Sequence, residues 1–420
     1  MRHALLIASI FCCALPSGAS PAIAQKVIRI TAAPAAWAPM FRELAAQFEE
    51  LNPDIAVKIE AKNRDFESLT EQTLREAITG DLPDLTVTGS NQVRAFVERG
   101  YAVDLGQFMS TDREWEDVGY SSAAADTGRI DGHQYSLTLA ASMPVIVYNK
   151  DLIAKAGANP EAFPSEWPDI INLGRKIAST DQDIGLFFEH ESNGNWMFLA
   201  LLESVGGKIA TPSNDVAFAS QQGLWSLDVI RLIGEAGQAR VDMSRDQARQ
   251  AFTAGKLGIL VTASSAIGGF QKQIGGRFPL GVAPFPLPSP SGRLPVAGLT
   301  AILLSKDQAR AFAAWKFLKF AMTPSSQAVI VKSTGMVPFN ERAIDDPNSL
   351  GSLYSSEPLF AVALRNRDRA TSWYSFPGPN SIKIFNTIKD ILQSVMTLKV
   401  PPEQALQEMK TKVAALMPRK

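Results

Sequence analysis

The residues of this chain best suited to chemistry stand where predicted strands end. Arg64 and Phe66 follow an apolar strand, and Ser90 lies in the run TGSNQ after the next one. A guanidinium can pair with an anionic group, a ring can stack on a sugar or glycerol face, and small hydroxyl and amide groups suit hydroxylated molecules. The alternatives are a solvated loop charge for Arg64, a core position for Phe66, and a helix cap for Ser90.

Two further clusters lie at predicted helix starts later in the chain. Trp196 follows the run NGN, and Ser264 and Ser265 end the run TASS. An exposed Trp196 would form a stacking wall, whereas a buried one would belong to a core. Hydroxyl groups and free N–H groups at a helix start attract anions, although an ordinary N-cap explains TASS equally well.

Catalytic motifs are missing from the sequence. Outside the first 24 residues it holds two histidines, His133 and His190, with no HExxH helix, no GxSxG elbow and no GxxxxGK[ST] loop. Glu189 and Glu191 flank His190, and paired carboxylates can support glycoside hydrolysis. Without geometry that pairing is arbitrary, so we expect a binding protein, not an enzyme, with no cofactor and no metal.

The amino terminus reads as an export signal, residues 1–24. It combines Arg2, an apolar core and the small-residue run Ala22-Ile23-Ala24. Both cysteines fall inside it, which predicts an exported mature chain without disulfides. Later apolar runs are too short to span a bilayer, and the net charge of −1 argues against nucleic acid as a partner.

The elements that must position these clusters alternate between strand and helix. Apolar runs at 27–31, 55–59 and 85–88 predict strands, separated by helices over about 37–51 and 66–79. Proline at 53 and glycine at 80 end the two helices. This order predicts an α/β fold with a buried parallel sheet. Two amphipathic helices, around 384–395 and 406–416, close the chain.

The stretch 144–178 carries a resemblance to a known family. It reads PVIVYNKDL, then KAG, then PSEW, and the order strand, YNKD, KAG, P-x-x-W resembles bacterial extracellular solute-binding proteins, the ligand-capturing subunits of ABC importers. The resemblance covers nearly all of the mature chain and is strongest over 144–178 and 251–342. It implies a two-lobe periplasmic binding protein fold (type II) with a three-segment hinge. The expected lobes are 26–140 plus 266–320, and 141–265 plus 321–420.

Within that family the chain is most similar to periplasmic glycerol-3-phosphate-binding and sugar-binding proteins. The run SMPVIVYNKD resembles their serine-rich hinge, which implies a ligand role for Ser142, and TASS matches as well. Gly298 matches a glycine that lets backbone approach the solute. Met336 stands where the family has a ligand tyrosine, and Trp373 adds aromatic surface nearby. The phosphate-pairing arginine is missing from the run SFPGP, so Arg64 or Arg369 would have to replace it, or the solute is neutral.

We therefore expect a monomeric carrier that closes on a small hydroxylated solute and delivers it to membrane permease subunits. The candidate solutes are glycerol-3-phosphate, a glycerophosphodiester or a sugar. The alternatives are an exported hydrolase of glycosides or phosphodiesters, a neutral oligosaccharide carrier of the same family, and a receptor-type interaction protein. The sequence leaves the solute, its charge and affinity, the permease and the hinge boundaries open.

Overall fold

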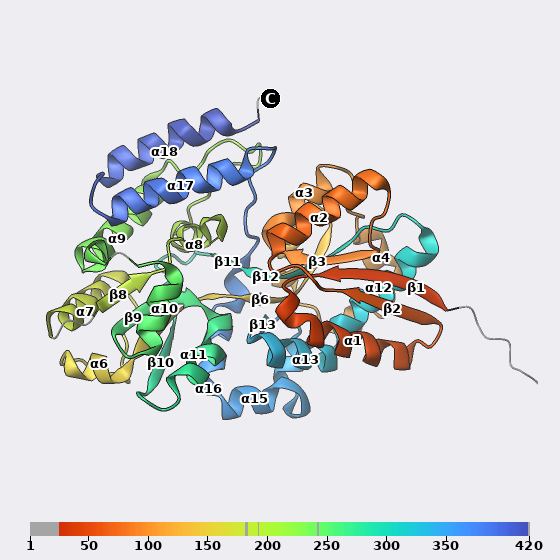
Figure 1. The fold of residues 1–420 in the computed structure, drawn as a ribbon, viewed down its shortest axis with the longest axis horizontal. Coiled ribbons are helices and arrows are strands. Elements are labelled where there is room, and N and C mark those ends of the chain that lie inside the picture. Colours follow the sequence, from red (N-terminus) through yellow and green to blue (C-terminus); the bar gives the residue numbers. More distant parts are fainter. Residues whose placement is uncertain (1–24, 181–183, 192, 242, 419–420) are drawn as a thin grey trace, which may run out of the picture.

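The computed structural model describes residues 25–180, 184–191, 193–241 and 243–418. The predicted export signal and its two cysteines lie outside the described residues. The chain forms two lobes side by side, each a sheet flanked by helices (Figure 1). This is the two-lobe α/β architecture that the sequence predicts.

The sheet of lobe 1 has six strands in the order β13-β6-β12-β3-β1-β2. Its opening strands β2, β1 and β3 pair in parallel, as the βαβαβ pattern predicts, whereas β12, β6 and β13 are antiparallel additions. The strands are β1 (Lys26–Ala32), β2 (Ile55–Glu60), β3 (Leu85–Gly89), β6 (Ser136–Ser142), β12 (Ala297–Leu303) and β13 (Val337–Pro338).

The sequence signals act locally as expected in the first two helices. Helix α1 (Ala38–Leu51) buries the predicted apolar stripe through Phe48 against the sheet. Leu51, expected on that stripe, is 70% exposed because it occupies the last position of the helix. Helix α2 (Phe66–Thr79) begins at the N-cap Asp65, which accepts a hydrogen bond from the Ser68 N–H, and ends at the left-handed Gly80.

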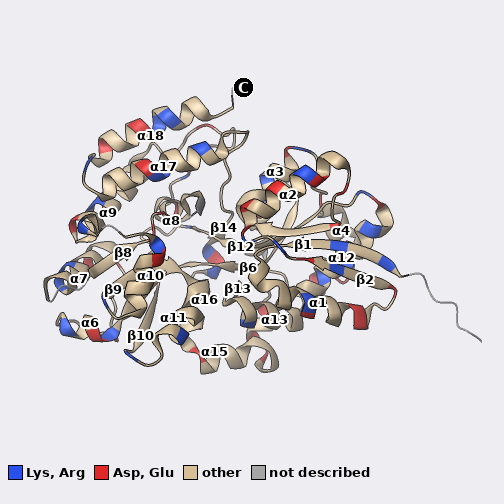
Figure 2. Cartoon of the chain, viewed as in Figure 1, with Lys and Arg blue, Asp and Glu red and all other residues tan. Residues whose placement is uncertain are grey.

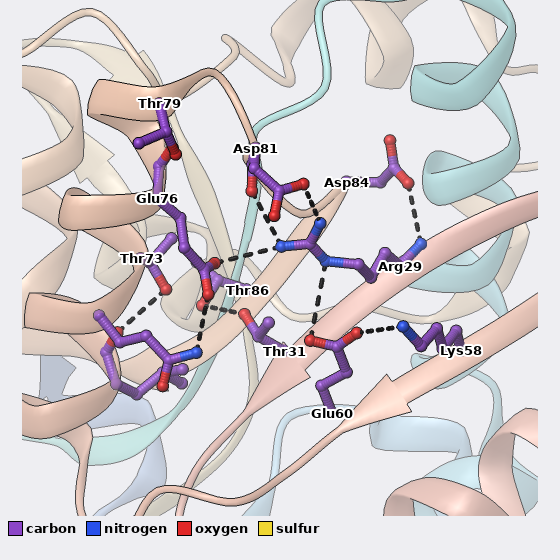
Figure 3. Close-up of polar contacts among 12 residues, drawn as sticks. Arg29, Thr31, Lys58, Glu60, Thr73, Glu76, Thr79, Asp81, Asp84 and Thr86 are labelled. Carbon is purple, nitrogen blue, oxygen red and sulfur yellow. Dashed lines mark hydrogen bonds and ion pairs between the residues drawn. The ribbon is translucent and has the colours of Figure 1, made fainter.

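An ionic cluster around Arg29 ties β1 to β2 and to the end of α2 (Figure 3). The guanidinium lies 2.5 Å from Asp81, 3.2 Å from Glu76 and 3.8 Å from Glu60. Burial alone would lower the pKa of Arg29, but these acids together raise it. The cluster lies beside the sheet and contributes to packing.

The sheet of lobe 2 has four strands in the order β10-β7-β9-β8. Strand β7 is the PVIVYN run of the sequence and is buried throughout. The strands are β7 (Pro144–Asn149), β8 (Ile184–Phe188), β9 (Leu257–Ala263) and β10 (Leu280–Pro284).

Helices cover both lobes, and two small ladders complete the fold. In lobe 1 and beside the hinge these helices are α1, α2, α3 (Val93–Val97), α4 (Gly106–Thr111), α5 (Ser122–Thr127), α12 (Gln308–Ala321), α13 (Pro324–Thr334), α14 (Glu341–Asp345) and α15 (Ser352–Ser356). In lobe 2 they are α6 (Lys150–Lys155), α7 (Trp167–Thr180), α8 (Trp196–Ser204), α9 (Gln221–Glu235), α10 (Arg245–Thr253), α11 (Ile267–Ile274), α16 (Pro358–Leu364), α17 (Ser381–Met396) and α18 (Pro402–Leu416). The ladders are β4 (Arg129–Ile130) with β5 (His133–Gln134), and β11 (Leu294–Pro295) with β14 (Ala370–Thr371).

Three segments connect the lobes, and the strand pairing differs from the expected lobe ranges at two of them. Residues 267–284 stay in lobe 2, because β10 pairs with β7. Residues 324–338 stay in lobe 1, because α13 packs on α1 and β13 pairs with β6. The chain therefore crosses at Met143, again over 285–296, and a third time after β13. The sequence placed the second and third crossings too early.

Acidic and basic residues are interspersed along the helices that cover both lobes (Figure 2). The two main cores are apolar and lie between each sheet and its helices. Within the described part of the chain, no helix has both the length and the apolar character needed to cross a bilayer.

Candidate functional site

A cavity of about 240 Å³ lies between the lobes and is lined from both of them. Lobe 1 contributes one face of α2 and residues of the segment from Asn91 to Arg99, which covers the end of the short helix η2 (Ser90–Gln92) and all of α3. Lobe 2 contributes Gly194, the loop before α17, and the first residues of α17. A cleft between two lobes is a preferred place for a small-molecule site.

Helix periodicity explains which side chains of α2 face the cavity. Glu67, Thr70, Glu71 and Leu74 have the i, i+3, i+4, i+7 spacing of a single helix face, and all four line the cavity. Burial raises the pKa of Glu67, its own backbone N–H opposes this, and the carboxylates of Asp65 and Glu71 raise it further. The cleft therefore holds a half-buried carboxylate in an acidic setting.

The arginines of lobe 1 that line the cavity already have partners in the protein. Arg94 Nη1 lies 3.8 Å from Glu98 Oε1 and 3.8 Å from Asp131 Oδ2. Arg99 Nη1 donates to the carbonyl of Ala95 at 2.8 Å. The positive charge of this wall is therefore largely committed to internal contacts.

The wall from lobe 2 carries no charged residue in the described chain. It presents Ser375 and Ser381 together with the rings of Phe376 and Phe385, whose centroids lie 5.4 Å apart. The N–H of Gly378 donates to Glu98 Oε2 at 3.5 Å, which brings the two lobes into contact at the cavity. A solute here would meet a charged wall on one side and an uncharged aromatic wall on the other.

Asn91 is the polar residue of the cavity that most lacks a partner. The residue is 4% exposed, and its Oδ1 atom is buried without a hydrogen-bond partner in the described structure. An unpaired buried amide oxygen is costly, so such groups are rare. A solute that donates a hydrogen bond would remove that cost.

Two of the predicted site residues bond the backbone of the hinge segment 285–296, and a third bonds the loop before α8. Ser90 Oγ donates to the carbonyl of Val296 at 2.9 Å, and Trp196 Nε1 donates to that of Pro295 at 2.7 Å. Trp373 Nε1 donates to the carbonyl of Gly194 at 3.3 Å. Trp196 is 4% exposed and belongs to the lobe 2 core, so the expectation of an exposed stacking wall at this side chain is wrong.

Other predicted residues gather at the first crossing. The Met143 N–H donates to Ser264 Oγ at 3.0 Å, and the Ser264 N–H donates to the Met143 carbonyl at 2.9 Å. Ser142 is buried directly before Met143, and Ser265 is half-buried beside Gly335, the residue before Met336. Met336 itself is buried in the lobe 1 core.

Gly298 has a packing reason to be glycine. A Cβ atom at this position would lie 2.4 Å from the carbonyl oxygen of Ala140 on the neighbouring strand. The missing side chain therefore allows β12 to pack on β6, and the predicted approach of backbone to a solute stays untested.

Arg64 and Phe66 lie at the amino end of α2. The Arg64 side chain is 93% exposed, and its Nε atom lies 3.2 Å from Asp65. Phe66 is half-buried and packs against Gly89. Neither Arg64 nor Arg369 lines the cavity, so neither supplies the phosphate-pairing arginine there in this conformation.

None of the ten predicted residues lines the cavity. The lining residues that sequence reasoning did not single out include Glu67, Thr70, Glu71, Arg94, Glu98 and Phe385, whereas Asn91 stood in the candidate run TGSNQ, and Ser375 and Phe376 in the run SFPGP. Two signals in the sequence could have found some of them. Phe66 and Ser90 directly precede lining residues, and the polar face of α2 follows from helix spacing.

The carboxylate pair considered for hydrolysis does not form a catalytic site. Glu189 is 2% exposed and accepts a bidentate contact from Arg249, at 2.7 and 2.9 Å, and a hydrogen bond from Thr262. His190 bonds Gln393 through Nε2. No group of three or more His, Cys, Asp or Glu residues in the described chain is placed to hold a metal ion.

Larger hollows lie outside the cleft. One of about 750 Å³ is built from lobe 1 alone, around Phe108 and Trp315, and another of about 550 Å³ lies beside the carboxyl-terminal residues Met417 and Pro418. Neither is lined from both lobes, so closure would not enclose a solute there.

Comparison with known proteins agrees with the two-lobe architecture. The bacterial extracellular solute-binding protein family matches residues 43–361. The sn-glycerol-3-phosphate-binding periplasmic protein UgpB of Escherichia coli (strain K12) is 23% identical over 405 residues, covering 88% of this chain and 89% of that protein.

Two solved structures extend the comparison of folds. The cyclic alpha-maltosyl-1,6-maltose binding protein from Arthrobacter globiformis has a TM-score of 0.77 at 22% identity, covering 93% of this chain and 99% of that one. UgpB from Mycobacterium tuberculosis in complex with glycerophosphocholine has a TM-score of 0.76 at 18% identity, covering 92% and 97%. The family match spans most of the sequence, so the chain belongs to the bacterial extracellular solute-binding proteins and is not an enzyme.

Proposed function

We propose that this solute-binding protein captures a small hydroxylated solute in the cavity between its lobes and delivers it to the permease of an ABC importer. The observation that carries the proposal is the cavity itself, because its walls come from both lobes and its hydrogen-bonding groups converge on one space. The names of its relatives include binders of a phosphorylated glycerol and of an oligosaccharide. Glycerol-3-phosphate, glycerophosphodiesters and sugars are therefore the classes to test.

The mechanism is closure of the two lobes around the solute. Rotation at the three crossings would bring α2 and α3 toward the first turn of α17, with the solute between them. A solute shifts this equilibrium only by its differential affinity for the closed form. Groups that contact it from both lobes at once, such as Asn91 from lobe 1 and Ser375 from lobe 2, would supply that difference.

Isothermal titration with glycerol-3-phosphate, glycerophosphocholine and a sugar panel tests the proposal, with small-angle scattering of the protein saturated with its best binder. We expect saturable binding by at least one compound and a smaller radius of gyration in its presence. Absence of binding across the panel, or an unchanged scattering profile at saturation, would overturn the proposal.

A substitution at Asn91 tests whether this residue of the cavity contacts the solute. Asn91→Ala removes the unpartnered amide, and we expect the affinity for the best binder to fall about tenfold, the loss of one hydrogen bond to a buried group. Asn172→Ala, at an exposed position of α7 in lobe 2, is the matched control and should bind as the wild type does. Equal affinities for the two variants would remove Asn91 from the site.

The proposal includes export of a monomer to the periplasm after cleavage near Ala24. The predicted signal and the family support it. Intact mass of the protein recovered from the periplasmic fraction would show whether the chain begins at about residue 25, and the scattering data give its oligomeric state.

A further inference from the structure

We infer that the solute of this cleft carries a protonated amine or ammonium group in addition to its hydroxyls, and that Glu67 receives this group. The inference rests on the proposed function and names the chemical class of its solute. It would place an anionic solute at a disadvantage in the same cavity.

The charge of the cavity is asymmetric. Every charged residue that lines it comes from lobe 1: Glu67, Glu71, Arg94, Glu98 and Arg99. Both arginines are engaged, as described above, by Glu98 and Asp131 and by the carbonyl of Ala95. Three of these five residues are acids, so the lining has an excess of one negative charge, although the neutral carbonyl of Ala95 does not cancel the charge of Arg99.

Glu67 is the acid that carries this excess. No basic side chain in the described structure lies within ion-pair distance of it, whereas Glu71 lies 3.8 Å from Arg75 at an exposed position. Burial is the largest cause that raises the pKa of Glu67. A half-buried carboxylate without a counter-ion gains most from a cation that arrives in the same space.

Asn91 supplies a second and independent observation. Its amide lines the same cavity, and its Oδ1 atom accepts no hydrogen bond in the described structure. Glu67 presents acceptor oxygens to this space, Asn91 adds a buried amide oxygen without a donor beside it, and an ammonium group is a donor with no acceptor capacity. The rings of Phe376 and Phe385 on the opposite wall add faces that attract cations as well as sugar rings.

The start of helix α17 favours an anion, and a carboxylate of the protein already lies near it. Helix α17 begins at the cavity, has no acidic residue in its first turn and receives no side-chain cap. The carboxylate of Glu98 approaches this end from lobe 1 through the contact with the Gly378 N–H. The anion expected near that helix start is therefore one of the protein's own, and a phosphate would have to compete with it.

A matched series separates charge from shape. Glucose, glucosamine and glucose 6-phosphate share one sugar ring and are neutral, cationic and anionic, respectively. Cellobiose and its diamino counterpart provide the same neutral and cationic pair as disaccharides. At pH 6.5, where the amines are protonated, titration should show the cationic member of at least one size binding about tenfold tighter than its neutral partner, since one charged hydrogen bond is worth that much. The phosphorylated sugar should bind more weakly than the neutral one.

Two variants locate the effect. Glu67→Gln keeps the shape of the side chain, and the preference for the amine should shrink to less than about twofold while binding of the neutral sugar is retained. Glu50→Gln removes an exposed acid of α1 in the same lobe and should leave the preference unchanged. Urea midpoints of both variants would verify that they fold.

Three outcomes overturn the inference: no compound of the series binds, the neutral or phosphorylated sugar binds as tightly as the amine, or the preference persists in Glu67→Gln. Failure of the proposed function gives a different result. A neutral or phosphorylated solute that binds and compacts the protein would refute only the amine, whereas no compaction by any solute would refute the carrier mechanism.

Discussion

Helix α2 uses its glutamates in two ways, according to which side of lobe 1 they face. Near the carboxyl end of the helix, Glu76 turns toward the sheet and lies 3.2 Å from Arg29, which Asp81 and Glu60 also approach (Figure 3). Near the amino end, Glu67 faces the interlobe cavity without a basic partner in the described structure. One helix thus carries a paired acid toward the sheet and an unpaired acid toward the cleft.

Lobe 2 also has a buried acid paired with an arginine, but it has no acid facing the cleft in the described chain. Its buried Glu189 is held by two contacts from Arg249, and its cleft wall holds no charged residue in the described chain. In both packed clusters a guanidinium accompanies the acid. Glu203 of α8 is a second acid without such a partner in the described structure, and burial raises its pKa to about 8. Of these two acids, Glu67 is the one that lines the interlobe cavity, where a solute can reach it.

The largest effect is expected where the paired acid is most buried. Arg249→Met leaves the buried carboxylate of Glu189 without an ionic partner and with only the Thr262 hydroxyl bonded to it. We expect urea unfolding to show a loss of about 3 kcal/mol, the scale for breaking a buried pair. Arg240→Met, at an exposed position nearby, should change stability little. A loss of similar size in both variants would mean that the buried Arg249–Glu189 pair contributes no more to stability than an exposed arginine does.

The Arg29 cluster should respond in the same direction but less strongly. Arg29→Met removes contacts to three acids that water still partly reaches, so we expect a loss of about 2 kcal/mol. Arg42→Met, at an exposed position of α1, is the control. In titrations under conditions where the variant is fully folded, its solute affinity should stay within about twofold of that of the wild type. A clear loss of affinity would show that the two sides of α2 are coupled.

The same contrast explains how far the sequence could predict the molecule. Local signals placed α2 at its observed residues, because the Asp65 cap and Gly80 act over a few positions. They also gave the parallel pairing of β1 with β2 and β3. Pairing over long distances was harder to predict, and β10 was assigned to the wrong lobe because its partner β7 lies about 130 residues earlier.

The candidate site was predicted less well for a physical reason. Ser90, Trp196 and Ser264 were chosen because their side chains can bind a solute, yet each bonds hinge backbone in the structure. Whether a polar group is free depends on partners far away in the sequence. Glu67 could have been found from the polar face of α2, but that its neighbours leave it unpaired appears only in three dimensions.

The smallest effect tests the unpaired acid itself. Glu67 has a raised pKa in the folded protein, so its favourable contribution is fully present below the ordinary value of about 4.5 and is lost as the pH rises through the folded value. Glu67→Gln cannot lose this contribution. Without solute, we therefore expect the variant to match the wild type near pH 4 and to exceed it by about 0.5 kcal/mol at pH 7, the scale of a surface substitution.

Urea unfolding at both pH values measures this difference, with Glu50→Gln as the control whose offset should not change with pH. A Glu67→Gln variant less stable than the wild type at pH 7 would mean that the carboxylate has a stabilising partner in the folded protein. Greater stability joined to weaker amine binding would instead show that this position trades stability for recognition, as functional sites commonly do. Glu76→Gln, on the far side of the same helix, should instead lower the stability, because the Glu76 carboxylate lies 3.2 Å from Arg29 in the folded protein with or without a solute.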